Sequence, residues 1–120
     1  MTIPAKDRAQ QLIAIEMAAF AAARAARNVS AAWTALERAH IVSQPHLGPH
    51  IACHWAMLGF AVGQGDWREA AGQIVRLVLA PVGALTGRIP SGNTGRSNVS
   101  AFQAMPIPDD LASQLNGYGE

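Results

Sequence analysis

The spacing of apolar residues along the first 80 positions predicts four helices separated by short polar breaks. We expect them at about residues 5–27, 30–43, 49–63 and 67–80. Alanine is abundant between residues 14 and 40 and β-branched runs are scarce, which favours helix there. Because each break is only a few residues long, consecutive helices should pack as antiparallel hairpins.

Residues with known capping preferences stand at the predicted breaks. Asn28 or Ser30 can cap the second helix, and Asp66 can cap the fourth. If Gly48 caps the third helix, Pro49 takes the first helical position, where its missing N–H costs nothing. The positions of these breaks determine which residues of consecutive antiparallel helices should lie level with one another.

A weak internal repeat supports the hairpin arrangement. The segment that begins at Asn28 can be laid over the one that begins at Asp66, and the phrase GQGDWREAAGQ resembles the turn of a tetratricopeptide hairpin. The usual period of that repeat is about 34 residues and several copies are normal. The tryptophans Trp33, Trp55 and Trp67 are expected to pack in the core or between hairpins.

The composition changes near residue 87. From there to residue 120 the chain is rich in Gly, Ser, Asn and Pro, with scattered apolar residues that predict an extended arm pinned to the helices. The fourth helix either ends at Pro81 or continues through Leu85, and Asp109 or Asp110 can cap a last short helix. The predicted fold is therefore one all-α domain over residues 1–120, with two antiparallel, tetratricopeptide-like hairpins and a C-terminal arm.

Composition and charge exclude several classes of partner. The chain has 120 residues, of which 50% are hydrophobic and 14% charged, with a net charge of +1. This is typical of a globular protein and gives no electrostatic footprint for nucleic acid or acidic membranes. A single cysteine cannot form an internal disulfide, and neither a signal peptide nor a membrane span is indicated. We expect a cytoplasmic location.

The candidate chemistry is concentrated around the second break. All four histidines, His40, His46, His50 and His54, lie within fifteen residues of one another, and Glu37 lies one turn before His40. An antiparallel turn near residues 46 and 47 places His40 level with the pair on the third helix.

The same reasoning, applied to the break near residue 28, brings Glu16 of the first helix to the level of His40. The spacing thus predicts five potential ligands at one depth, namely Glu16, Glu37, His40, His50 and His54. His46 is expected in the corner, and Cys53 and Met57 are expected in the core.

Neutral imidazole and carboxylate groups suit zinc, iron, manganese or copper. A glutamate on one helix and an ExxH pair on the next resemble half of a ferritin-like site. A second ExxH is missing, so a mononuclear or purely binding site is favoured over a dinuclear centre. Spacing does not set helix rotation. The histidines could therefore be structural, with Glu16 paired to Arg76, in a module of helical hairpins that binds another protein or a second copy of itself.

Other chemistry is poorly supported by the sequence. No nucleophile, nucleotide-binding or HExxH motif is present, so no catalytic residue is assigned and a small metalloenzyme ranks behind the other two hypotheses. Arg88 and Arg96 lie among glycines and hydroxyls, where an anion could bind. Their spacing matches no phosphate-binding loop, and ordinary loop structure is favoured.

Several separated blocks also resemble a known family. ERAHIVSQPHLGPHIACHWAML, GDWREAAGQIVRL, GRIPSGNTGRSNVSAF and MPIPDDLA are similar to blocks in a family of small bacterial proteins known only as a domain of unknown function. The resemblance runs from about Arg24 to Ala112 and includes all four histidines. Members of that family are often found beside heavy-metal resistance genes, which implies a role in metal handling or resistance without assigning a role to any residue.

Overall fold

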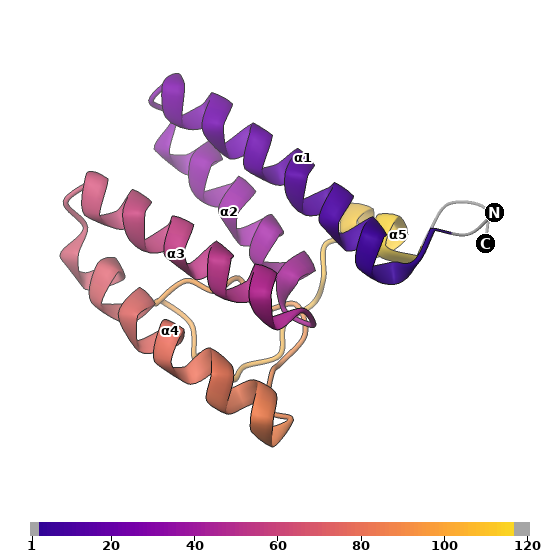
Figure 1. Cartoon of the computed structure of the whole chain (residues 1–120). Helices are drawn as coiled ribbons and strands as arrows, with labels where there is room; N and C mark the ends of the chain where they lie inside the picture. Colours follow the sequence, from indigo (N-terminus) through magenta and orange to yellow (C-terminus); the bar gives the residue numbers. More distant parts are fainter. Residues whose placement is uncertain (1–2, 117–120) are drawn as a thin grey trace.

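The structure, a computed structural model, describes residues 3–116. Over that range its regular secondary structure consists of helices without strands. Its five helices are α1 (Ala5–Ala25), α2 (Val29–Ser43), α3 (Leu47–Gly63), α4 (Trp67–Thr86) and α5 (Asp109–Asn116). Helices α1 and α2 form one antiparallel hairpin, α3 and α4 form a second, and α2 packs against α3 to join them (Figure 1). The predicted all-α fold of two hairpins is confirmed.

The breaks between helices follow the predicted capping residues, with one exception. The Oδ1 atom of Asn28 accepts a hydrogen bond from the backbone N–H of Ala31 at 3.0 Å, and Asp66 caps α4 in the same way through Glu69 at 3.1 Å. Helix α3 begins earlier than predicted, with His46 rather than Gly48 at the N-cap. Pro49 is still in the first turn, where backbone N–H groups have no intrahelical acceptor.

Helix α4 continues through Pro81 and ends only at Thr86. The proline removes one backbone donor but leaves the following turn helical, so the longer of the two predicted ends is the observed one. Gly87 then takes a left-handed conformation with φ of 71°, which suits glycine and stops the helix. The chain turns there into the arm.

The main apolar core lies between the two hairpins. Phe60 of α3 packs edge-on against Phe20 of α1 and Trp33 of α2, with ring centroids 5.4 and 5.2 Å apart. Cys53 and Met57 are buried in the same cluster, as predicted. A smaller cluster forms where Leu111 of α5 is buried against α1 and α2, and it ties the end of the described chain to the first hairpin.

The prediction for two of the tryptophans was wrong. Trp33 is buried, but Trp55 and Trp67 are 61% and 68% exposed. Trp55 lies two positions from both Cys53 and Met57 on α3, so it points to the opposite side of the helix from the core. In the described part of the chain, nothing packs over this outer face of the second hairpin.

The arm between α4 and α5 is irregular and is pinned to the helices. In Figure 1 it runs back from the end of α4 past α2 and α3 before it reaches α5. Asn93 is 1% exposed, and its side chain donates to the carbonyl oxygens of Ser100 and Gln103 at 2.8 and 2.7 Å. Its backbone N–H donates to Oε1 of Gln44, the residue that follows α2, at 3.1 Å. The arm is thus part of the packed structure.

Within residues 3–116, no helix is long and apolar enough to cross a membrane.

Candidate metal centre

Three histidine side chains converge between α2 and α3. His40 comes from α2, and His50 and His54 come from successive turns of α3. Their Nε2 atoms form a triangle in which each pair is 3.1 Å apart. The three residues are between 2% and 4% exposed. These nitrogens are close enough together to hold one metal ion.

The arm fixes the tautomer of His40. The Nδ1 atom lies 2.6 Å from the carbonyl oxygen of Asn93, which can only accept, so Nδ1 carries the proton. The neutral ring therefore presents the Nε2 lone pair to the other two histidines. Gly95 covers the ring face with φ of 83°, and a Cβ at this position would lie 2.6 Å from Cδ2 of His40. Only glycine fits there without displacement.

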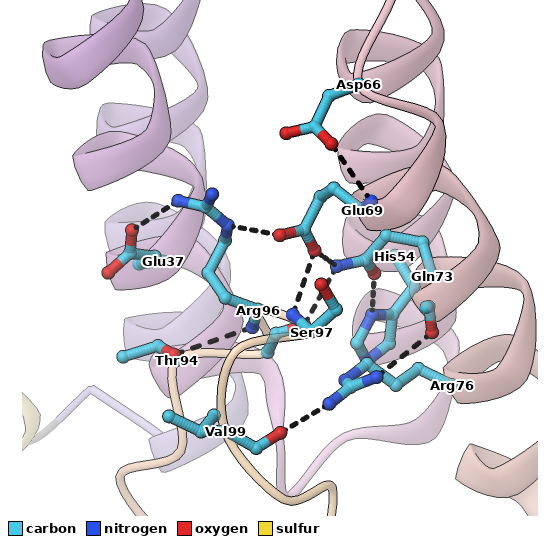
Figure 2. Close-up of polar contacts among 12 residues, drawn as sticks. Glu37, His54, Asp66, Glu69, Gln73, Arg76, Thr94, Arg96, Ser97 and Val99 are labelled. Carbon is cyan, nitrogen blue, oxygen red and sulfur yellow. Dashed lines mark hydrogen bonds and ion pairs between the residues drawn. The ribbon is translucent and has the colours of Figure 1, made fainter.

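Helix α4 fixes the tautomer of His54. Its Nδ1 atom lies 2.7 Å from Oε1 of Gln73, which is fully buried. The amide nitrogen of Gln73 donates to Glu69 and to the carbonyl oxygen of Gly95, which leaves Oε1 as an acceptor (Figure 2). His54 must therefore be protonated at Nδ1 and also presents its Nε2 lone pair to the triangle.

His50 cannot satisfy both of its neighbours. Its Nδ1 atom is buried without a hydrogen-bond partner among the described residues. A neutral His50 can place one proton on Nε2 and donate to either His40 or His54, but not to both. The contact between His40 and His54 then still brings lone pair against lone pair, and a His50 proton on Nδ1 instead would leave all three contacts at 3.1 Å in that state. A cation at the centre would turn all three contacts into favourable ones.

The environment keeps the three rings neutral. Burial lowers the pKa of His40 well below its usual value, and the neighbouring histidines and Arg76 add to this. Burial and His54 lower the pKa of His50 to about 4. Burial also lowers the pKa of His54, although its hydrogen bond to Gln73 opposes the shift. Neutral imidazole is the form that binds metals.

The structure does not bring the two predicted carboxylates to the histidines. Glu37 pairs with Arg96 of the arm at 3.3 Å, and Glu16 pairs with Arg38 at 3.0 Å rather than with Arg76. These ion pairs direct both carboxylates toward arginines. Of the five residues predicted at the site, the structure brings together His40, His50 and His54.

His46 and Cys53 also lie outside the histidine group. His46 is half-buried at the start of α3. The Cys53 thiol contacts the carbonyl oxygen of Leu36 at 3.5 Å, and burial raises its pKa to about 12. A thiol in that state is a core group and not a nucleophile.

A charged network beside the site occupies the arginine that had been considered for anion binding. The Arg96 guanidinium contacts Glu69 at 2.8 Å and stacks 3.8 Å from the Trp33 ring centroid. Burial acts to raise the pKa of Glu69, but hydrogen bonds from Arg96, Gln73 and the backbone of Ser97 outweigh it and lower that pKa. Figure 2 shows Arg96 lying between Glu37 and Glu69. Ordinary loop structure therefore accounts for Arg96.

A small cavity adjoins the triangle. Its volume is about 20 Å³, enough for about one water-sized group. The three histidines and Arg76 contribute polar groups to its wall, and most of the rest is apolar, including Leu79, Ile89 and Phe102. The cavity at the three histidines therefore has room for one small group.

Four residues at the site were not predicted from the sequence, namely Gln73, Asn93, Gly95 and Arg76. Gln73 lies one turn after Glu69 on α4, and that spacing alone does not separate it from a surface glutamine. Asn93 and Gly95 belong to the NTG segment of the arm, which was noted only as part of a resembling block. Their roles depend on the path of the arm, which has no periodicity to follow.

The chain matches, over residues 7–115, the family described as a protein of unknown function (DUF3703), and it belongs to that family. No curated protein and no solved structure gives a significant match. The family name carries no activity, so the function has to be argued from the site.

Proposed function

We propose that this protein binds one divalent transition metal ion through the Nε2 atoms of His40, His50 and His54. The observation that carries the proposal is the pair of fixed tautomers. Asn93 and Gln73 force His40 and His54 to direct bare lone pairs at the same point. As a purely structural cluster, this arrangement leaves repulsive contacts that apolar side chains of similar size would avoid.

The spacing of the three nitrogens supports a compact, one-sided ligand set. With metal–nitrogen bonds of about 2.0–2.1 Å, nitrogens this far apart subtend angles of about 100° at the ion. Three equivalent angles of that size fit three corners of a tetrahedron or one face of an octahedron. They disfavour the square-planar geometry of copper(II), in which two of three ligands lie opposite each other.

The ligand chemistry narrows the choice of metal further. Three neutral imidazoles without a carboxylate or thiolate suit zinc or ferrous iron better than manganese, which prefers oxygen ligands. Three protein ligands also leave a coordination position open, as in zinc sites that bind an exogenous group. The heavy-metal association implied by the family resemblance fits a role in metal handling. Catalysis requires a substrate that the site does not identify, so we propose binding alone.

The proposal is tested by titrating metal-free protein with zinc against a chromophoric chelator. We expect one ion per chain and a loss of affinity of at least about 100-fold for His40→Ala, His50→Ala or His54→Ala, because an inner ligand should matter more than an outer-shell partner worth about 10–100-fold. His46→Ala is the matched control and should bind zinc like the wild type.

The same titration separates the present ligand set from the wider one predicted by spacing. Glu16→Gln and Glu37→Gln should leave zinc affinity nearly unchanged, because both carboxylates are engaged by arginines. Absence of stoichiometric binding, or equal losses in His46→Ala and His50→Ala, would sink the proposal and favour the hypothesis that the histidines are structural.

A further inference from the structure

Arg76 is the second unusual group at the cavity. It lies on α4, is 9% exposed and lines the same small space as the three histidines. Its two terminal nitrogens donate to the carbonyl oxygens of Gly72 and Val99. Its Nε atom is buried with no hydrogen-bond partner among the described residues. A buried charged group with an unused donor indicates a missing acceptor.

The position of Arg76 is difficult to explain in a site for a cation alone. Arg76 places a positive charge at the wall of the cavity that the three histidines line, so it must also repel a metal ion bound between them. Arginine remains protonated even when burial lowers its pKa, as it does here. A site evolved for a bare cation would be expected to place a carboxylate here instead.

The nearby carboxylates do not compensate a bound metal. Arg76 is near Glu69, Glu69 is paired with Arg96, and Arg96 is also paired with Glu37. The charges of these two arginines and two glutamates therefore sum to zero in the metal-free protein. A divalent ion held by three neutral rings would therefore add two uncompensated positive charges to a buried site, which is costly.

We infer that the metal-loaded site takes a small monoanion, such as chloride or hydroxide, as a further ligand, with Arg76 as the residue that holds it. The inference rests on the proposed function and names the class of ligand at the open position. The cavity limits this ligand to about the size of one water molecule. The unused Nε donor of Arg76 provides a charge-assisted hydrogen bond to the anion.

The test uses the full chain loaded with cobalt(II), whose visible spectrum reports on its ligands. Sodium chloride is titrated into a sodium perchlorate background at constant ionic strength, first at pH 6 and then at pH 8. We expect a saturable change in the spectrum at pH 6. At pH 8 chloride should bind more weakly, because hydroxide competes for the same position.

Substitution of Arg76 separates anion binding from general structural support. Arg76→Met should weaken chloride binding by at least about 10-fold, since a hydrogen bond to a charged group is lost. In perchlorate alone at pH 6 it should bind cobalt(II) at least as tightly as the wild type, because repulsion of the cation is removed. Arg76→Lys should restore much of the chloride affinity, and Arg68→Met, an exposed position on the same helix, should change neither measurement.

The outcomes of these titrations distinguish anion binding from metal binding. Stoichiometric cobalt binding with no spectral response to chloride at either pH overturns the anion inference and leaves metal binding intact. The anion inference is also overturned if Arg76→Met loses affinity for both cobalt and chloride and Arg76→Lys restores neither affinity. That result would mean that Arg76 has a structural role. Failure of the wild type to bind cobalt overturns both.

Discussion

The interface between α2 and α3 has two halves that differ in chemistry although they are one helical turn apart. In one half, Leu36 and Met57 are fully buried among aromatic rings. In the other, His40 and His54 occupy the next turn on the same faces of the same helices. Both halves are equally protected from water, but only the first consists of groups that need no partner.

The two halves of the interface should therefore contribute to stability in different ways. The apolar half gains free energy from burial alone, at roughly 25 cal/mol per Å² of apolar surface. The histidine half buries polar atoms whose mutual contacts cannot all be satisfied, so the proposed metal ion should stabilise it further. Substitutions in the two halves should therefore have different consequences.

The largest effect of a substitution is expected in the apolar half, on the free energy of unfolding. Phe60→Ala removes the ring that contacts both Phe20 and Trp33, and should lower the free energy of unfolding by about 3–5 kcal/mol in urea titrations. The folded variant should still bind one zinc ion per chain. Trp55→Ala, on the exposed side of α3, should cost less than about 0.5 kcal/mol. If Phe60→Ala abolished zinc binding while it remained folded, the two halves would not be independent.

An intermediate effect is expected from Gln73, which supports the histidine half from outside the triangle. Gln73→Leu removes the acceptor that fixes the His54 tautomer and should weaken zinc binding by about 10–100-fold in chelator competition. Gln11→Leu, at an exposed position of α1, is the control and should not alter affinity. Unchanged affinity in Gln73→Leu would mean that the tautomer is set by something else.

The smallest effect per residue is the pH dependence of the metal-free protein's stability near pH 6. Because burial lowers the histidine pKa values in the folded state, the unfolded chain takes up protons first as the pH falls below about 6.5. The contribution of these histidines to the free energy of unfolding should therefore be constant above that pH. It should decline as the pH falls toward 4, by at most about 1 kcal/mol per histidine at pH 6. The decline should be weaker in His50→Phe. A metal-free protein that became more stable on acidification from pH 7 to 5 would contradict this.

The sequence was sufficient for the helices and for the depth of the histidines. Asn28, Asp66 and the short breaks predicted the hairpins, and their antiparallel register brought His40 level with His50 and His54. It was not sufficient for rotation. Glu37 is three residues from His40 and so lies about 60° away around the helix axis, which is enough to direct it to Arg96 instead of the triangle.

The residues that complete the site could not be predicted for a different reason. Asn93, Gly95 and Val99 act through backbone carbonyls or close backbone contact, and any residue type has a carbonyl to offer. Arg76 and Gln73 are polar residues on a helix, where a solvent-exposed position is the ordinary expectation. Only the path of the arm shows that they are buried.

The hydrogen bond from His40 to Asn93 joins residues 53 positions apart, whereas the hairpins join neighbouring helices through breaks of a few residues. Contacts between distant parts of a chain carry a larger loop-closure cost and tend to form later in folding. We therefore expect the helices to be packed before the arm closes over the histidines. During synthesis, the three rings leave the ribosome well before Asn93, so the arm can fix the protonation of His40 only after the helices that carry the rings have been made.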